Sequence, residues 1–141
     1  MNIAGASALV TGAGSGLGEA VARELARLGA KVAVLDINAA GAQRVAADIG
    51  GIASACDICD SASVSAALDA ATAAHGVPRI VMNIAGIGTA KRIVGSDGSP
   101  APLEDFERVV HINLVGTYNV SRLAAARIVA LDALEDGERG V

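Results

Sequence analysis

Short runs of β-branched and other apolar residues alternate with longer amphipathic stretches along almost the whole sequence. Strands are expected at residues 7–11, 31–36, 52–56 and 79–83, and helices at residues 17–28, 39–49, 61–75 and 103–134. Strands joined by crossover helices form a parallel sheet, and right-handed crossovers restrict the order of its strands. The alternation therefore predicts an α/β fold with a doubly wound parallel sheet, strand order 3-2-1-4, and a ligand site at the carboxyl ends of the strands.

The length and composition fit one globular domain and exclude several classes of protein. Hydrophobic residues make up 52% of the 141 residues and the net charge is only −4, whereas disordered chains combine low hydrophobicity with high net charge. The basic residues are scattered, so no nucleic-acid partner is expected. Neither a membrane segment nor a signal peptide is recognisable, and two cysteines make no disulfide framework, so we expect a cytoplasmic protein.

A glycine-rich turn at residues 11–18 links the first expected strand to the first expected helix. The free N–H groups and the positive dipole end of a helix N-terminus attract phosphates, and glycines let a pyrophosphate approach them. The spacing is GxxxGxG, which is neither GxGxxG nor a P-loop. A packing turn in a Gly- and Ala-rich protein is the alternative. We expect a dinucleotide-binding Rossmann domain whose turn contacts the cofactor through Gly12, Ser15, Gly16, Leu17 and Gly18.

Asp36 ends the second expected strand, at the place where an acidic residue can bind both ribose hydroxyls of adenosine. A carboxylate at this place repels a 2′-phosphate. No Arg or Lys stands beside it in the sequence, because Ile37 follows and Ser15 occupies the turn. These residues favour NAD over NADP as the cofactor, and a solvated carboxylate at the end of a strand is the alternative.

With these residues and three further motifs, the sequence resembles the short-chain dehydrogenases/reductases over residues 7–141. Residues 11–18 match the TGxxxGxG turn of the family, and Asp57 and Ile58 match the end of its third strand. The resemblance implies that Asp57 contacts adenine through its carboxylate and Ile58 through its backbone. Residues 83–86 match the NNAG signature of the family, with Ile84 in place of the second Asn. The resemblance implies that four further residues line the cofactor site: Asn83, Ile84, Ala85 and Gly86.

Asn113 matches the Asn of the family's catalytic tetrad, which by resemblance holds a water that relays protons. The other three members are a Ser, a Tyr that acts as the general acid and base, and a Lys four residues after that Tyr. The sequence contains no Tyr-x-x-x-Lys, because its single tyrosine, Tyr118, is followed by Arg122 at that distance. We therefore expect residues 1–141 to be the N-terminal, NAD-binding part of an enzyme, truncated before strand five, with the catalytic C-terminal part absent.

Residues 103–109 and 113–120 are similar to type-II 3-hydroxyacyl-CoA dehydrogenases. This resemblance implies NAD-dependent oxidation of a 3-hydroxyacyl-CoA thioester, with an acyl-CoA as the substrate. Reduction of 3-oxoacyl thioesters and oxidation of hydroxysteroids are alternatives within the family, since these enzymes share most of the motifs. A non-catalytic nucleotide-binding module, acting as a sensor or a partner subunit, is the alternative from another class.

The remaining residues of chemical interest have simpler interpretations. No metal site is expected, because Cys56 and Cys59 lack further soft ligands and His75 and His111 lack partners. Tyr118 is expected in the core or at a helix interface. Lys91 and Arg92 could meet the phosphates of CoA, and solvated loop charges are the simpler interpretation of both.

We also expect a homo-oligomer, for two reasons. The strand at residues 79–83 should have one unpaired edge beside apolar residues, and such an edge pairs readily with another chain. In the family that the sequence resembles, the long helix packs against its equivalent in a neighbouring subunit. The expected apolar surface of this helix is made of Val109, Ile112, Val115, Leu123, Ile128 and Leu131.

Overall fold

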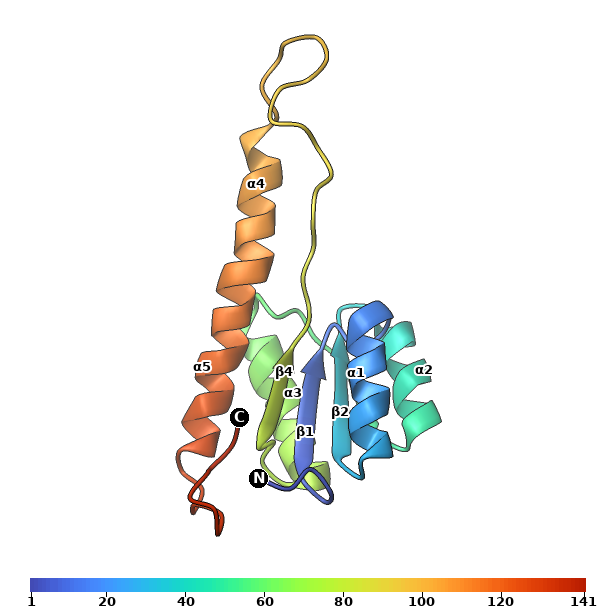
Figure 1. The fold of residues 1–141 in the computed structure, drawn as a ribbon, viewed down its shortest axis with the longest axis vertical. Helices are drawn as coiled ribbons and strands as arrows, with labels where there is room; N and C mark the ends of the chain where they lie inside the picture. Colours follow the sequence, from blue (N-terminus) through green and yellow to red (C-terminus); the bar gives the residue numbers. More distant parts are fainter.

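A computed structural model describes residues 1–141, and its core is a four-stranded parallel sheet (Figure 1). The strands lie in the order β3-β2-β1-β4, which confirms the predicted order 3-2-1-4. In the register of the central pair, Ser7 lies opposite Lys31 and Thr11 opposite Leu35. All strands therefore end at one edge of the sheet, where the predicted site residues follow them. The strands are β1 (Ser7–Thr11), β2 (Lys31–Asp36), β3 (Ile52–Ala55) and β4 (Ile80–Asn83).

Helices cover both faces of the sheet, because successive side chains of each buried strand point to opposite faces. On one face, Val10 and Val34 pack with α1 (Gly16–Arg27) and α2 (Ala39–Ile49). On the other face, Leu9 and Leu35 pack with α3 (Ser61–His75) and α5 (Thr117–Ile128). The two apolar layers share the strands between them, and they account for the continuous hydrophobic runs in β1 and β2.

The stretch predicted as one helix over residues 103–134 consists of three elements and ends earlier. These are α4 (Leu103–Val110), a π-helical segment η1 (His111–Gly116), and α5, which ends at Ile128. The prediction of a helix to Leu134 was wrong. The chain instead folds back toward β4, where the Arg79 guanidinium donates hydrogen bonds to the carbonyls of Asp132 and Arg139. Tertiary contacts of this kind override local helix propensity.

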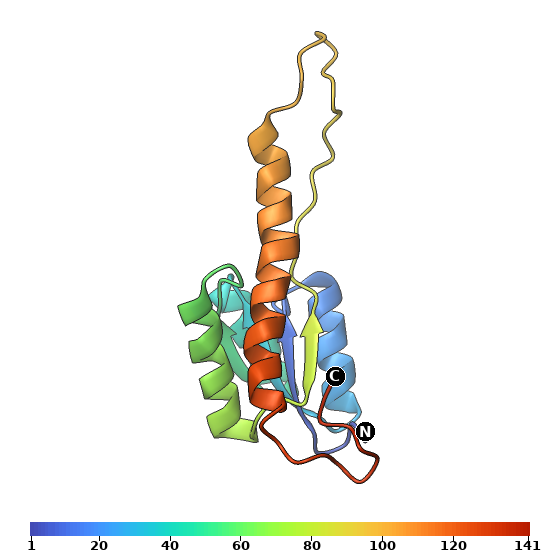
Figure 2. The same ribbon diagram turned by 90° about the vertical axis from the view of Figure 1, so that its left-hand side faces the viewer.

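The loop at residues 86–102 and α4 project together beyond the sheet as an arm (Figures 1 and 2). Phe106 and Tyr118 are 65% and 67% exposed, whereas Ile112 and Leu123, expected at the apolar surface, pack against the core on the α3 side. Tyr118 is therefore not a core residue. In this arm, Lys91 forms an ion pair with Asp105, so its charge is partnered within the chain.

The free edge of β4 is partly paired. Val141 donates to the carbonyl of Arg79 and accepts from the N–H of Val81, both over 2.7 Å. This is the bonding pattern of a parallel neighbour. Val141 thus lies beside β4 with the hydrogen bonds of a parallel fifth strand. The expectation that this edge is wholly unpaired was wrong at its N-terminal end, where Arg79 and Val81 are bonded to Val141.

The N-cap of α3 is Asp60, whose carboxylate accepts hydrogen bonds from the N–H groups of Ala62 and Ser63. The Ser61 hydroxyl instead donates to Asn119 on α5 over 2.9 Å. The loop before α3 is therefore held both by its own helix and by α5. None of the helices combines the length and the apolar character needed to cross a membrane.

Candidate functional site at the carboxyl edge of the sheet

The glycine turn brings β1 and α1 closer together than side chains would allow. A Cβ atom on Gly18 would lie 2.0 Å from the carbonyl oxygen of Gly12. A Cβ atom on Gly12, whose φ is +66°, would lie 2.7 Å from the Cα atom of Ala85. These two glycines allow β1, the start of α1 and the loop after β4 to approach one another closely. The turn therefore has a packing role.

The same turn also leaves bare backbone at the N-terminus of α1. The side chain of Ser15, the N-cap residue, makes no capping hydrogen bond, and a Cβ atom on Gly16 would meet nothing within 4 Å. The first N–H groups of a helix have no partner within the helix, and the helix dipole adds positive potential there. This end of α1 therefore fits a phosphate group that comes close to the backbone.

The carboxylate of Asp36 is fixed at the end of β2 by two backbone amides. The N–H of Gly14 donates to Oδ2 over 2.9 Å, and the N–H of Asn38 donates to Oδ1 over 2.8 Å. Each carboxylate oxygen keeps a further lone pair. Asp36 is thus oriented by the turn and by the start of α2, and it can still accept hydrogen bonds from two hydroxyl groups.

Asp57 and Ile58 lie in the loop between β3 and α3, which is braced on two sides. The carboxylate of Asp57 accepts from the N–H of Cys59 over 2.9 Å. The carbonyl of Ile58 accepts from the side-chain amide of the buried Asn119 over 2.9 Å. Burial raises the pKa of the Cys56 thiol just before them, which makes that thiol a poor nucleophile.

The loop after β4 is attached to β1 through Thr11. The Thr11 hydroxyl accepts from the N–H groups of Ile84 and Ala85, over 3.1 and 3.2 Å. Asn83 lies behind this loop, where its amide donates to Ser121 and its Oδ1 atom is buried without a partner. The loop therefore presents Ile84, Ala85 and Gly86 toward the carboxyl edge of the sheet.

Asn113 lies in the π-helical segment, and its side chain is bonded to the backbone of one residue. Its Oδ1 atom accepts from the N–H of Ile87, and its Nδ2 atom donates to the carbonyl of Ile87, both over 2.8 Å. A Cβ atom on Gly86 would lie 3.1 Å from Oδ1 of Asn113. The side chain of Asn113 thus fixes where the loop at residues 86–102 leaves the sheet.

These segments enclose a cleft of about 510 Å³ at the carboxyl edge. Of the thirteen residues that the sequence predicts, all but Asn83 and Asn113 line it: Gly12, Ser15, Gly16, Leu17, Gly18, Asp36, Asp57, Ile58, Ile84, Ala85 and Gly86. Sequence reasoning missed five further lining residues, which are Ile37, Cys56, Ile87, Arg108 and Ile112. Ile112 and Arg108 lie one turn apart on the long helix, and only the path of that helix brings them to the cleft.

One basic residue lies closer to the glycine turn than the sequence suggested. Arg44, on α2, donates from Nη2 to the carbonyl of Gly14 over 3.1 Å. The N–H of the same glycine is bonded to Asp36. Arg44 is not a neighbour of Asp36 in the sequence, and the packing of α2 brings it back to the glycine turn.

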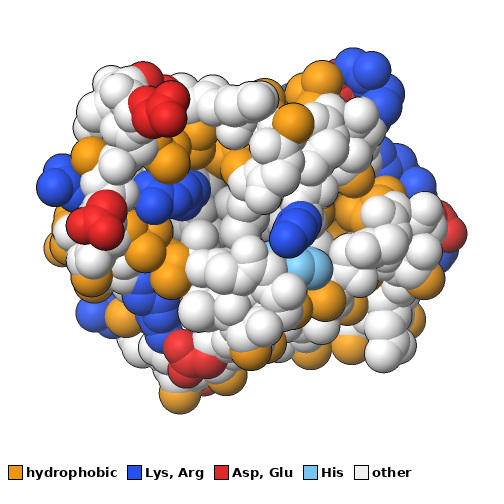
Figure 3. Space-filling model, turned by 90° about the horizontal axis from the view of Figure 1, so that it is seen from below, with side chains coloured by type: hydrophobic (Ala, Val, Ile, Leu, Met, Phe, Trp, Pro, Cys, Tyr) orange, Lys and Arg blue, Asp and Glu red, His pale blue; other side chains and the backbone are white.

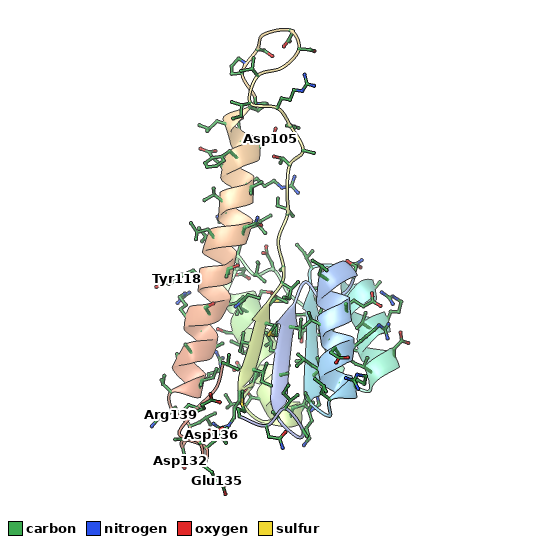
Figure 4. The ribbon with its side chains drawn as sticks, viewed as in Figure 1. Asp105, Tyr118, Asp132, Glu135, Asp136 and Arg139 are labelled. Atoms are coloured by element: carbon green, nitrogen blue, oxygen red, sulfur yellow. The ribbon has the colours of Figure 1, made fainter.

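A second cavity, of about 720 Å³, opens at the opposite end of the sheet. It is lined in part by Ser7, His75, Arg79 and Leu131, and apolar and basic side chains and a histidine share this face (Figure 3). Acidic residues of the last turn, among them Asp136, border it (Figure 4). Ligands of open parallel sheets bind at the carboxyl ends of the strands, so this basal cavity is not the candidate cofactor site.

The side chains of this chain form neither a metal centre nor a Tyr-Lys pair. No group of three or more His, Cys, Asp or Glu side chains is arranged to hold a metal ion. Tyr118 projects from the side of α5 that faces away from the sheet (Figure 4). Tyr118 does not line the cleft.

Comparison with known proteins agrees with this geometry. The short chain dehydrogenase family model matches residues 6–140. The 3-hydroxyacyl-CoA dehydrogenase type-2 of Drosophila melanogaster is 40% identical over 142 residues, covering 99% of this chain and 56% of the relative. A crystal structure of 3-hydroxyacyl-CoA dehydrogenase type-2 from Mycobacterium avium superposes with a TM-score of 0.89 at 40% identity, covering 96% of this chain and 54% of that one.

A second solved structure is a 3-ketoacyl-(acyl-carrier-protein) reductase from Brucella melitensis complexed with NADH. It superposes with a TM-score of 0.80 at 40% identity, covering 89% of this chain and 51% of that one. The chain thus spans about half the length of the relatives it matches. The family model covers nearly all of the sequence, and the strand order and the glycine turn agree with it, so the chain belongs to the short chain dehydrogenase family.

Proposed function

We propose that residues 1–141 form the NAD-binding part of an oxidoreductase that interconverts a secondary alcohol and a ketone. The observation that carries this proposal is the cleft at the carboxyl edge. Eleven residues expected to bind the cofactor line it together, although they come from four separate segments of the chain. The chemistry of these residues favours a nucleotide, because a bare helix N-terminus and an oriented carboxylate meet in this one cleft.

Each part of the cleft suits one part of a dinucleotide. The bare backbone at Gly16 suits the pyrophosphate, and the oriented carboxylate of Asp36 suits the two ribose hydroxyls. Asp57 and Ile58 would border the adenine, while Ile84, Ala85 and Gly86 would border the nicotinamide half. The nicotinamide, when bound, supplies the hydride acceptor or donor.

For the substrate, we propose a 3-hydroxyacyl-CoA that is converted to a 3-oxoacyl-CoA. Two of the similar proteins carry the name 3-hydroxyacyl-CoA dehydrogenase type-2, and both match nearly the whole chain. The Brucella reductase supports the reverse reaction on a thioester as the second candidate. In both candidate reactions, hydride is exchanged between carbon 3 of the acyl chain and the nicotinamide of the cofactor. The two reactions run in opposite directions. The two unpaired cysteines fit the reducing cytoplasm as the location.

We further propose that the chain assembles with a second copy of itself through its long helix. Its exposed helix face consists of Phe106, Leu114, Val115 and Tyr118, which lie on α4, η1 and α5. Contiguous exposed apolar side chains of this size are typical of interfaces between chains. The resemblance to a family whose equivalent helices pair between subunits favours another copy of this chain as the partner.

The 141-residue polypeptide is expected to bind NAD and to show no turnover with 3-hydroxyacyl-CoA or simple secondary alcohols. General acid/base catalysis needs a group within hydrogen-bond reach of the reacting oxygen, and Tyr118 lies outside the cleft without a Lys four residues later. The measurement is NADH formation followed by its absorbance, with a complete short-chain dehydrogenase assayed in parallel. Reproducible NADH formation by the pure polypeptide would show that the missing residues are not required.

Replacing Asp36 with Ala is expected to weaken NAD binding about tenfold while changing NADP binding much less, because the carboxylate accepts from ribose hydroxyls only when no 2′-phosphate is present. The preference for NAD should therefore narrow. Calorimetric titration with each cofactor measures this ratio, and Asp48→Ala, which removes a carboxylate outside the cleft, is the control. Tighter binding of NADP than NAD by the unaltered chain would refute the assignment of the cofactor.

A further inference from the structure

The guanidinium of Arg44 is bonded to Gly14 of the glycine turn, whose N–H is bonded to Asp36, and Arg44 does not itself line the cleft. Gly14 connects the two charged groups, since its N–H donates to Asp36 over 2.9 Å and its carbonyl accepts from Arg44 over 3.1 Å. A Cβ atom on Gly14 would come within 3.0 Å of the Asp36 carboxylate, and one on Gly41 within 2.9 Å of the Gly14 carbonyl. The start of α2 thus packs directly on the turn and brings Arg44 with it.

Glu19, on the first turn of α1, holds this guanidinium in a two-pronged ion pair. Nη2 of Arg44 is 2.6 Å from Oε2 of Glu19, and Nη1 is 3.0 Å from Oε1. Arg23 donates to the same carboxylate, and two guanidinium groups hold the pKa of Glu19 at about 2. The carboxylate is therefore ionised at neutral pH, and its side chain is only 20% exposed.

The arrangement bears on how the site distinguishes two nucleotides. A 2′-phosphate is accepted in dinucleotide-binding folds where a nearby Arg can pair with it, and the planar fork of Arg suits phosphate as well as carboxylate. Arg44 is the basic residue bonded to the turn, and its side chain is still 52% exposed. While Nη1 and Nη2 of Arg44 are both bonded to Glu19, few N–H groups of Arg44 are left to donate to a phosphate beside Asp36.

We propose that Glu19 is a specificity-determining residue for the cofactor: it binds Arg44 and so withholds from a 2′-phosphate the guanidinium that is bonded to the glycine turn. The carboxylate of Asp36 then repels the 2′-phosphate of NADP. Glu19 adds to this discrimination because it binds the guanidinium of Arg44, whose positive charge would otherwise offset the repulsion. The proposal rests on the proposed binding of NAD at this cleft.

The test is the ratio of NAD to NADP dissociation constants in Glu19→Gln, which removes the charge and keeps the shape of the side chain. Release of Arg44 should tighten NADP relative to NAD roughly three- to tenfold, as one partly exposed charge pair allows. Both constants come from one preparation, so any loss of folded protein cancels in the ratio. The effect should shrink at high salt, because exposed charge pairs are screened.

Two further variants isolate Arg44 as the cause. In Glu19→Gln/Arg44→Gln the gain for NADP should disappear. In Asp48→Asn, which alters a carboxylate of the same network that contacts Arg23 and not Arg44, the ratio should stay at its original value. An unchanged ratio in Glu19→Gln, or a gain that survives in the double variant, would overturn the inference. An unaltered chain that binds neither nucleotide would instead overturn the proposed function, and the inference with it.

Discussion

Replacing Gly18 with Ala is expected to lower the free energy of unfolding by about 3 kcal/mol and to reduce NAD binding at least about tenfold. The added methyl group would lie 2.0 Å from the carbonyl oxygen of Gly12 and 3.0 Å from the Cα atom of Ala13. Both neighbours are backbone atoms, so no side chain can rotate to make room. The N-terminus of α1 must therefore move away from β1, and the proposed phosphate site moves with it.

Gly88→Ala provides the matched control, since a Cβ atom there meets nothing within 4 Å and the change of residue type is the same. Urea unfolding curves and NAD titrations of the two variants and the unaltered chain make the comparison. If all three proteins have the same free energy of unfolding and the same affinity for NAD, the close approach of α1 to β1 contributes neither to stability nor to NAD binding.

The 141-residue polypeptide is expected to self-associate, and the double variant Phe106→Glu/Tyr118→Glu is expected to weaken this association at least about hundredfold. Buried aromatic side chains at the centre of an interface contribute about 2 kcal/mol or more each, and introduced charges add a desolvation cost. Sedimentation velocity over a wide range of concentrations gives the dissociation constant. Phe106 and Tyr118 are exposed, so the substitutions should leave the core of the isolated chain intact.

Ile93→Glu is the control for added surface charge, because Ile93 is an 85% exposed apolar residue in the loop at residues 86–102. It should associate like the unaltered chain. If the double variant stays associated, the edge of β4 rather than the helix face would be the contact, since Val141 covers only part of that edge. A sharp monomer boundary for the unaltered chain at all concentrations would contradict the proposed assembly.

The sheet could be predicted from the sequence because its signals are local and repeated. Apolar runs in β1 and β2 are buried on both faces, and each is followed by a helix of suitable length, so strand order followed from the handedness of the crossovers. The candidate site could be predicted for a related reason. Turns at the ends of parallel strands meet at one edge, so residues 12–18, Asp36 and residues 57–58 had to lie close together.

The features that could not be predicted depend on contacts between distant segments. The Ser61 hydroxyl on the first turn of α3 is bonded to Asn119 on α5. The long helix contains a π-helical segment and ends at Ile128, where the chain returns to β4. No propensity or periodicity in the sequence encodes these partners. Arg44 belongs to the same group, since its approach to Gly14 depends on how α2 packs against the turn.

The residues that contact NAD can be mapped directly in solution. Titration of the isotope-labelled polypeptide with NAD, followed by amide chemical shifts, reports this residue by residue. If the carboxyl-edge cleft binds NAD, the largest changes occur at Gly14, Gly16, Asp36, Ile58 and Gly86, and the amides around the basal cavity, such as those of Ser7 and His75, stay unchanged. Saturable changes confined to the basal cavity, or none at millimolar NAD, would contradict the assignment of the carboxyl-edge cleft as the cofactor site.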